Sequence, residues 1–166
     1  MSNKNRLLHE RLAAVVSTLR HGEMVYIADA GSGTAAASLV PLSPQVEVID
    51  VAISTGCPTV GDLLRVLWEV GDFEAAFVTE NMRLANPKAR DRVEGMTGPE
   101  HIHELRYLPE FYDLRNRCKV FIQTGDYGVH SNVILVAGYP SPPIPVEWLI
   151  SPTWFEDLRQ SQNKKV

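Results

Sequence analysis

The chain has 166 residues, of which 45% are hydrophobic and 22% are charged, a balance that suits one globular domain of ordinary size and excludes wholesale disorder. Sixteen Lys and Arg against twenty Asp and Glu give a net charge of -4, which argues against a general binder of nucleic acid or of anionic membranes. No apolar run approaches the roughly 18 residues of a membrane span. The first residues lack the apolar core of a signal peptide, so we expect a cytoplasmic protein.

Helices and strands alternate along residues 1–138. In chain order we expect a helix over 4–20, strands over 24–28 and 46–52, a helix from 59, a strand over 75–78, a helix from 87 to 95, a strand over 102–106, a short helix over 111–117, and strands over 119–123 and 133–137. Thr59 followed by Asp62 has the pattern of a capping box. Asn86 followed by Pro87 has the pattern of an N-cap with proline in the first turn. The alternation predicts an α/β domain with a mostly parallel central sheet flanked by helices.

Residues 139–166 have a different composition. They include five prolines, which oppose regular structure across most of the segment: Pro140, Pro142, Pro143, Pro145 and Pro152. Trp148, Trp154 and Phe155 make the segment too apolar for a free tail. We expect a Pro-rich C-terminal extension that packs on its own domain or on a neighbouring subunit.

Two cysteines, Cys57 and Cys118, cannot form a disulfide framework or a four-ligand zinc site by themselves. We expect both to be buried thiols in a reducing compartment.

The polar residues of interest stand at the ends of apolar runs. His21 lies between the first helix and the first strand, and Asp29 lies at the carboxyl end of that strand. Others of this kind are Asp50, Arg106, Asp126, His130 and Asn132. Ligands of open α/β sheets collect at strand carboxyl ends, which favours Asp29. By position alone, an Asp after a strand is more often a turn or cap residue than a catalyst, and a lone His is more often a hydrogen-bonded surface group.

Several short segments follow one another in a fixed order: LRHGE at 19–23, IADAG at 27–31, VIDVA at 48–52, TGCPT at 55–59, VGDFEAA at 70–76, NP at 86–87, TGD at 124–126 and SNVILVAG at 131–138. Each is short, but the ordered set is specific. Over residues 7–138 it resembles the D-ribose pyranase and L-fucose mutarotase family. The Glu-Ala-Ala strand and the Asn-Pro helix start are more similar to the ribose branch.

The resemblance implies an isomerase without metal or organic cofactor that interconverts cyclic forms of a free monosaccharide. These forms are pyranose and furanose, or α and β anomers, of a sugar such as ribose or fucose. It also implies a cleft shared by neighbouring subunits of a ring-shaped homo-oligomer, often a decamer. His21 matches the family's proton donor, and an imidazole both gives and takes a proton near neutrality.

The substrate-binding residues follow from the same resemblance. Asp29 matches a sugar-binding carboxylate, and Asn132 matches the amide near the C-terminus, with Ser131 in the same stretch. Arg106 resembles the arginine of an Arg-aromatic pair in the fucose branch. The family usually has Tyr where this chain has His130. In addition, the loop between residues 30 and 46 is longer than its counterpart in the family.

We therefore expect a cytoplasmic sugar mutarotase or pyranase with a monosaccharide substrate and no nucleic-acid or membrane partner. Two alternatives remain open. The change at His130 favours a non-catalytic sugar-binding or regulatory module on the same scaffold. The other alternative is an enzyme that carries out a different sugar reaction in the same pocket.

Overall fold

The computed structural model describes residues 6–165, and within them six strands form one sheet in the order β2-β5-β1-β6-β3-β4. The strands are β1 (Met24–Ala28), β2 (Glu47–Asp50), β3 (Phe73–Thr79), β4 (Ile102–Leu105), β5 (Val120–Gln123) and β6 (Val133–Ala137). The pairs β2–β5, β5–β1 and β3–β4 are parallel, whereas β6 runs antiparallel to both of its neighbours. The predicted α/β class with a mostly parallel sheet is confirmed, with one reversed strand inside the sheet.

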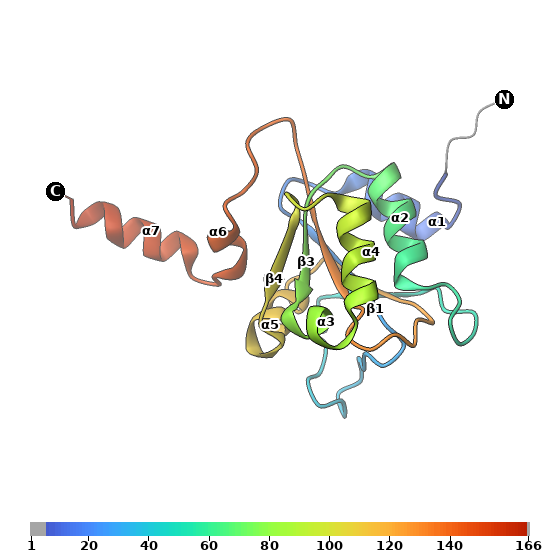
Figure 1. Cartoon of the computed structure of the whole chain (residues 1–166). Coiled ribbons are helices and arrows are strands. Elements are labelled where there is room, and N and C mark those ends of the chain that lie inside the picture. Colours follow the sequence, from blue (N-terminus) through green and yellow to red (C-terminus); the bar gives the residue numbers. More distant parts are fainter. Residues whose placement is uncertain (1–5, 166) are drawn as a thin grey trace.

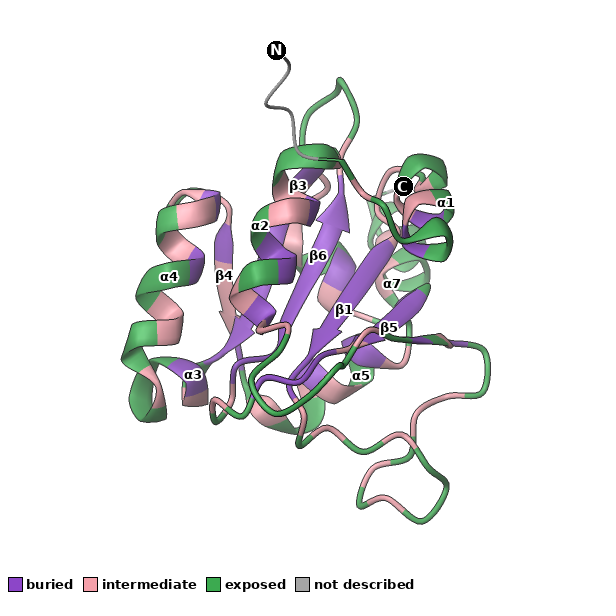
Figure 2. Cartoon of the chain, turned by 90° about the vertical axis from the view of Figure 1, so that its right-hand side faces the viewer, coloured by how far each residue is buried: buried purple, intermediate pink, exposed green. Residues whose placement is uncertain are grey.

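Helices lie on both faces of this sheet. They are α1 (Glu10–Thr18), α2 (Val60–Val70), α3 (Glu80–Ala85), α4 (Pro87–Thr97), the irregular turn η1 (Tyr107–Phe111), α5 (Tyr112–Arg115), α6 (Val146–Ile150) and α7 (Trp154–Asn163). α1, α2 and α4 pack against one face, where α2 and α4 lie side by side (Figures 1 and 2). The other face packs against Phe111, against Leu114 of α5 and against Leu149 of α6. Burial on both faces explains why the inner strands β1 and β6 are continuous apolar runs, whereas the edge strands β2 and β4 also carry polar residues.

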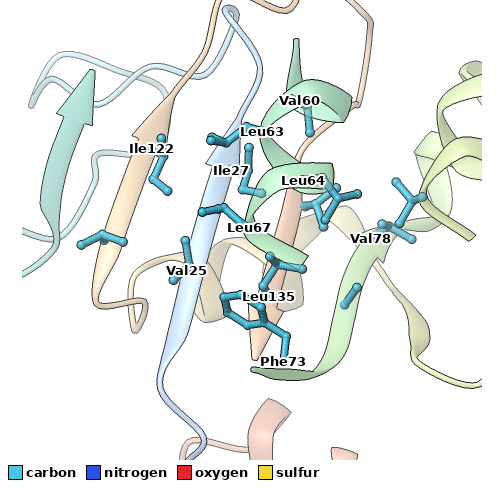
Figure 3. Packing of buried hydrophobic residues seen from close by; sticks show 14 of the residues in the cluster. Val25, Ile27, Val60, Leu63, Leu64, Leu67, Phe73, Val78, Ile122 and Leu135 are labelled. Atoms are coloured by element: carbon cyan, nitrogen blue, oxygen red, sulfur yellow. The ribbon is translucent and has the colours of Figure 1, made fainter. Parts of the chain in front are cut away.

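The larger hydrophobic cluster lies between α2 and the sheet (Figure 3). Leu64 and Leu67 of α2 and Val25 and Ile27 of β1 are all fully buried in it. Burying each such side chain contributes about 1.5–3 kcal/mol to folding. This packing holds β1 rigidly, and the two ends of β1 carry His21 and Asp29.

The two predicted helix starts are confirmed. The Thr59 side chain accepts a hydrogen bond from the Asp62 N–H, and the Asp62 carboxylate accepts one from the Thr59 N–H. Asn86 caps α4 by accepting from the N–H of Ala89, and Pro87 is the first residue of that helix. Both helices therefore begin where their local sequence directs.

The first helix is shorter than the predicted span of 4–20. α1 begins at Glu10, because the His9 side chain accepts a hydrogen bond from the Leu12 N–H at 3.3 Å and so caps the helix. Residues 4 and 5 of the predicted span lie outside the described residues.

Two further helix boundaries differ from the prediction. α4 continues past Gly95 to Thr97 and ends at Gly98, whose φ of 87° is the left-handed conformation that glycine adopts without strain. α3 was not predicted, because it follows β3 without a break. Its start is fixed by Thr79, whose side chain accepts a hydrogen bond from the Met82 N–H.

The C-terminal segment holds more regular structure than predicted. α6 begins directly after Pro145, and α7 begins two residues after Pro152. Pro145 and Pro152 stand just before helices, where a missing N–H costs nothing, so the prediction of irregular structure across most of the segment is wrong, although residues 139–144 are irregular. Leu149 of α6 is buried against the sheet. α7 contacts α6, has no buried residue and projects away from the sheet (Figure 1).

Candidate functional site

His21 and Asp29 lie at opposite ends of β1. His21 precedes the strand, next to the end of β6, where the Gly22 N–H donates to the Ala137 carbonyl. Asp29 follows the strand and lies beside Asn132, which precedes β6. The five residues of β1 alone span roughly 16 Å. One copy of the chain therefore does not bring His21 to the cavity in which Asp29 and Asn132 lie.

A cavity of about 400 Å³ opens at the Asp29 end of the sheet. Its lining comes from the segment after β1, from the turn at the start of α5 and from the loop that leads into β6. The lining residues are Asp29, Ala30, Gly31, Ser32, Tyr107, Tyr112, Asp126, Tyr127, Gly128, Val129, His130 and Asn132. The volume is within the range of small-molecule sites in proteins.

The polar floor of this cavity joins two distant parts of the chain. The Asn132 Oδ1 atom accepts hydrogen bonds from the Asp29 N–H at 2.6 Å and from the Ser32 hydroxyl at 3.0 Å. The Asp29 Oδ1 atom lies 3.0 Å from the same hydroxyl and accepts from the Gly31 N–H at 3.1 Å. The carboxylate and the amide are thereby held side by side, and together they can accept from and donate to neighbouring hydroxyl groups.

Burial opposes the charge of Asp29, whose residue surface is 8% exposed. Desolvation is the largest effect and raises the pKa of Asp29 above its ordinary value, and the nearby charge of Asp126 adds to this. Hydrogen bonds from Ser32, Gly31 and the Ser131 backbone act in the opposite direction. The carboxylate is a strong acceptor whose charge is costly until a ligand replaces the lost water.

Asp126 fixes the loop that carries His130, Ser131 and Asn132. One of its oxygens accepts from the Val60 N–H at the start of α2 at 2.9 Å, and the other accepts from the Gly128 N–H at 2.6 Å. The Ser131 hydroxyl then donates to the Gly128 carbonyl at 2.8 Å. Ser131 is buried, and its side-chain hydrogen bond to Gly128 stays within the loop, so it shapes the cavity wall from behind.

His130 forms part of an aromatic wall. Its φ of 52° is in the left-handed region, so the loop turns sharply at this residue. The Tyr107 and His130 rings meet edge to face, with centroids 5.2 Å apart. The Tyr107 and Tyr112 hydroxyls are 2.9 Å apart. Burial raises the pKa of Tyr107 to about 12, with the hydroxyl of Tyr112 as a second cause, so Tyr107 stays a neutral donor at physiological pH.

A buried arginine supports this wall. Arg115 is 1% exposed, and its guanidinium lies 4.4 Å from the centre of the Tyr112 ring. It donates to the Val40 carbonyl at 2.8 Å, and Asn116 accepts from the Ser43 N–H at 3.1 Å. These bonds tie the long loop after β1 to α5.

Arg106 lies outside the cavity lining of its own chain. It follows β4, and its exposed guanidinium pairs with Glu110 at 2.7 Å across the turn η1. Of the residues singled out from the sequence, four therefore line one cavity and Ser131 backs it. The four lining residues are Asp29, Asp126, His130 and Asn132. His21, Asp50 and Arg106 lie elsewhere.

His21 has its own polar partner. Its Nε2 atom lies 2.9 Å from Oε2 and 3.1 Å from Oε1 of Glu74, on β3. The Tyr139 ring stacks on the imidazole, with centroids 6.0 Å apart and planes 29° apart.

Sequence reasoning missed Ser32, Tyr107, Tyr112 and Glu74 as members of these two clusters. Glu74 occupies the second position of the β3 sequence FEAAFVT, and a lone charged residue inside an otherwise apolar strand is a signal that could have singled it out. The tyrosines carry no such signal, because their contact with His130 depends on the path of the turn η1.

The described residues contain no group of three or more His, Cys, Asp and Glu side chains placed to hold a metal ion. Both cysteines are free, with Cys118 buried as expected. Cys57 is exposed, contrary to expectation, because it lies in the turn between β2 and α2. Within residues 6–165 no helix is long and apolar enough to cross a membrane.

The chain is similar to proteins of one family along most of its length. The sequence model of the RbsD / FucU transport protein family matches residues 2–140. A D-ribose pyranase from Pseudomonas putida is 30% identical over 135 residues, which cover 81% of this chain and 96% of that protein. A D-ribose pyranase from Pseudomonas entomophila is 32% identical over 137 residues, with the same coverage of both chains.

Solved structures agree with these matches. The structure of Bacillus subtilis RbsD complexed with D-ribose has a TM-score of 0.73 at 27% identity and covers 84% of this chain and 100% of that chain. The fucose mutarotase from Streptococcus pneumoniae in complex with L-fucose has a TM-score of 0.62 at 16% identity and covers 85% of this chain and 100% of that chain. The second likeness shows a shared fold. α6 and α7 lie beyond the region that the family model matches.

Proposed function

Because the chain belongs to the RbsD / FucU transport protein family, we propose that it is a monosaccharide mutarotase or pyranase, an isomerase that interconverts the cyclic forms of a free sugar. The resemblance found in the sequence is confirmed by the family match, which covers residues 2–140. A free pentose or hexose is the substrate class, because the relatives include D-ribose pyranases and a ribose-bound structure.

One observation carries the proposal. Asp29 and Asn132, 103 positions apart in the sequence, share the Ser32 hydroxyl on the floor of a sugar-sized cavity. A sugar presents adjacent hydroxyls that each donate and accept, and a carboxylate beside an amide complements that pattern. The aromatic wall of Tyr107 and His130 offers an apolar surface to the C–H groups of the ring.

The reaction requires proton transfers at two oxygens. One group removes the proton of the anomeric hydroxyl while another protonates the ring oxygen, and the bond between that oxygen and the anomeric carbon breaks to give the open-chain aldehyde. Reclosure on the other face, or by another hydroxyl, reverses these transfers and returns both protons. General acid–base help of this kind accelerates a reaction by about 10²–10⁴-fold. In this proposal His21 is the acid–base group, because an imidazole nitrogen can take up a proton from the sugar and give it back near neutrality.

The positions of His21 and Asp29 support a site that is shared between subunits. His21 stands at the far end of β1 from its own cavity, so it would serve the cavity of a neighbouring copy. An interface that joins one end of each subunit to the other end of the next is heterologous, and it forms a ring when the rotation between subunits closes. We therefore propose a ring-shaped homo-oligomer, with the decamer of the family as its expected size. Arg106 is exposed and lies outside the cavity of its own chain, so in this proposal it would contact the sugar in the cavity of a neighbouring subunit.

Two free cysteines, one of them exposed, suit a reducing compartment, and the proposal includes a cytoplasmic location.

Saturation-transfer NMR tests the proposal directly, because it measures exchange between sugar forms at equilibrium. The full chain should accelerate exchange between the pyranose and furanose forms of D-ribose, or between the anomers of another sugar in an aldose panel. His21→Ala should abolish the acceleration and leave the fold intact, because His21 lies outside both hydrophobic clusters and its loss opens no core cavity.

A folded His21→Ala protein with wild-type exchange would contradict the role of His21. Saturable sugar binding by the wild-type chain without faster exchange would instead support the sugar-binding module.

A further inference from the structure

The imidazole of His21 is held along one edge and one face. Its Nε2 atom faces both oxygens of Glu74, at 2.9 and 3.1 Å. The Glu74 side chain is only 9% exposed and comes from β3, so its position is fixed by the sheet. Tyr139 covers one face of the ring. Within the described residues, Nδ1 has no hydrogen bond, and the His21 side chain is 25% exposed.

The C-terminal extension contacts the same pair. The Ile144 N–H donates to Glu74 Oε1 at 3.0 Å. The Ile144 side chain lies over Gly22, where an added Cβ would come within 2.6 Å of the Ile144 Cδ1 atom. Gly22 has a φ of 85°, so this turn combines the backbone freedom and the small size of glycine. Ile144 lies beyond residue 140, where the family match ends, so this contact belongs to the part of the chain outside the matched domain.

We propose that Glu74 is a positioning residue that sets the tautomer and orientation of His21, and that the extension holds Glu74 in place through the Ile144 N–H. This rests on the proposed role of His21 as the acid–base group. A carboxylate accepts and does not donate, so Glu74 keeps the ring proton on Nε2 and leaves Nδ1 as the basic atom that meets the sugar. Its negative charge also stabilises the imidazolium that forms when Nδ1 takes a proton.

The first test is Glu74→Gln, read by the ¹⁵N chemical shifts of the His21 ring and by sugar exchange. Glutamine has one acceptor oxygen where Glu74 uses two, and its amide N–H groups repel the ring N–H. We expect the single Nε2-protonated tautomer of the wild type to become a mixture, and kcat to fall about 10- to 100-fold with little change in KM. Glu23→Gln is the matched control, because Glu23 accepts from the Arg20 N–H and pairs with Lys119 without touching His21.

The second test separates the Ile144 N–H from its side chain. Ile144→Ala removes the packing over Gly22 and keeps the N–H, whereas Ile144→Pro removes both. Proline also fixes φ, but residue 144 already stands between Pro143 and Pro145, so the lost N–H is the main difference between the two variants. The kcat of Ile144→Pro should be about fivefold below that of Ile144→Ala, with a greater loss of the Nε2 tautomer.

An unchanged tautomer and unchanged kcat in Glu74→Gln would overturn the role of Glu74. Equal kcat and tautomer in the two Ile144 variants would overturn the role of the extension. Failure of the proposed function would look different, because the wild-type chain would then not accelerate sugar exchange, while the ring shifts would still report whether Glu74 fixes the tautomer.

Discussion

At the scale of single residues, the buried carboxylate of Asp29 lowers the stability of the protein and favours the binding of a ligand. Its carboxylate is buried, and the hydrogen bonds of Gly31 and Ser32 reduce the cost of desolvation without removing it, since the pKa of Asp29 is still raised. A ligand hydroxyl that donates to this carboxylate recovers part of that cost. In the protein without bound ligand, the buried charge of Asp29 therefore lowers the free energy of unfolding.

Asp29→Asn should therefore stabilise the protein and weaken sugar binding. Because the pKa of Asp29 is raised in the fold, its contribution to stability is complete at acidic pH and is lost as pH rises through the raised value. Calorimetry should show a higher Tm for the variant at neutral pH, and the difference should vanish below the ordinary aspartate range. Sugar affinity should fall about 10- to 100-fold, as expected for a lost bond to a charged acceptor. A variant with lower Tm at neutral pH and unchanged affinity would contradict this account.

His130, where the family resemblance leads us to expect Tyr, lines the cavity beside Tyr107. His130→Tyr should place a third phenol in the aromatic wall and shift the ranking of aldoses toward D-ribose. We expect the ratio of the exchange rates of D-ribose and a second aldose to change about tenfold. A polar side chain that bonds to a substrate hydroxyl discriminates strongly against sugars that lack that hydroxyl. The same ranking before and after the substitution would place His130 outside the sugar contacts.

At the scale of elements, the cavity depends on how α2 is joined to the loop before β6. Asp126 caps the first turn of α2 through the Val60 N–H and holds the loop through the Gly128 N–H. Thr59 caps the same helix through the Asp62 N–H and has no bond to the loop. The two caps support one helix, and only Asp126 also supports the cavity.

Asp126→Ala and Thr59→Ala form a matched pair. Each should lower the free energy of unfolding by about 1–2 kcal/mol in urea denaturation, as the loss of a helix cap does. Only Asp126→Ala should also weaken sugar binding, because the loop that carries His130 and Asn132 loses its support. Equal sugar affinity in the two variants would show that the loop holds its shape without Asp126.

The two C-terminal helices have different surroundings. Leu149 of α6 is buried against the sheet, whereas α7 has no buried residue. Within the described chain, the Trp154 ring stacks on Trp148 and meets Phe155 edge to face. An apolar cluster left without cover in one subunit is typical of an interaction surface.

Deleting residues 151–166 should therefore leave the stability of the subunit nearly unchanged and lower the mass of the oligomer or weaken sugar affinity. The subunit should change by about 0.5 kcal/mol or less, as for surface substitutions. Light scattering and the exchange assay are the measurements. A truncated protein with the mass and kinetics of the full chain would show that α7 serves neither assembly nor the pocket.

The sequence was informative where local signals decide the structure. The span of β1, the span of β6 and the cap at Asn86 were predicted as observed, because apolar runs and cap residues act locally. Asp29 and Asn132 were predicted to belong to one site, and they meet because β1 and β6 are antiparallel neighbours. That pairing came from the family resemblance, since no local signal specifies strand order.

The remaining contacts depend on long-range packing. Glu74 meets His21 across 53 positions of sequence, and the Ile144 N–H reaches Glu74 across 70. Tyr107 reaches His130 because the turn η1 directs its ring toward the loop before β6. Such contacts follow from the three-dimensional path of the chain, which periodicity and caps do not determine.

At the scale of the whole molecule, β1 separates the two halves of the proposed site. The cavity with Asp29 and Asn132 lies at one end of the strand, and His21 with Glu74 lies at the other. A repeated head-to-tail contact would bring the His21 end of one subunit to the cavity of the next, and each subunit would then contribute to two sites. The central claim is that sugar exchange requires two neighbouring chains.

Subunit mixing tests that claim. His21→Ala and Asp29→Asn chains are assembled in equal amounts, and the mixed oligomers are isolated with two affinity tags. Saturation-transfer NMR then compares their sugar exchange rate with that of each variant alone, at sugar concentrations below saturation. Each site takes Asp29 from one chain and His21 from the next, and each residue is intact in half of the chains. Random mixing therefore leaves about a quarter of the sites intact, and the mixed oligomer should recover about a quarter of the wild-type exchange rate. Mixed oligomers no more active than the two separate variants would show that each site is built within one chain.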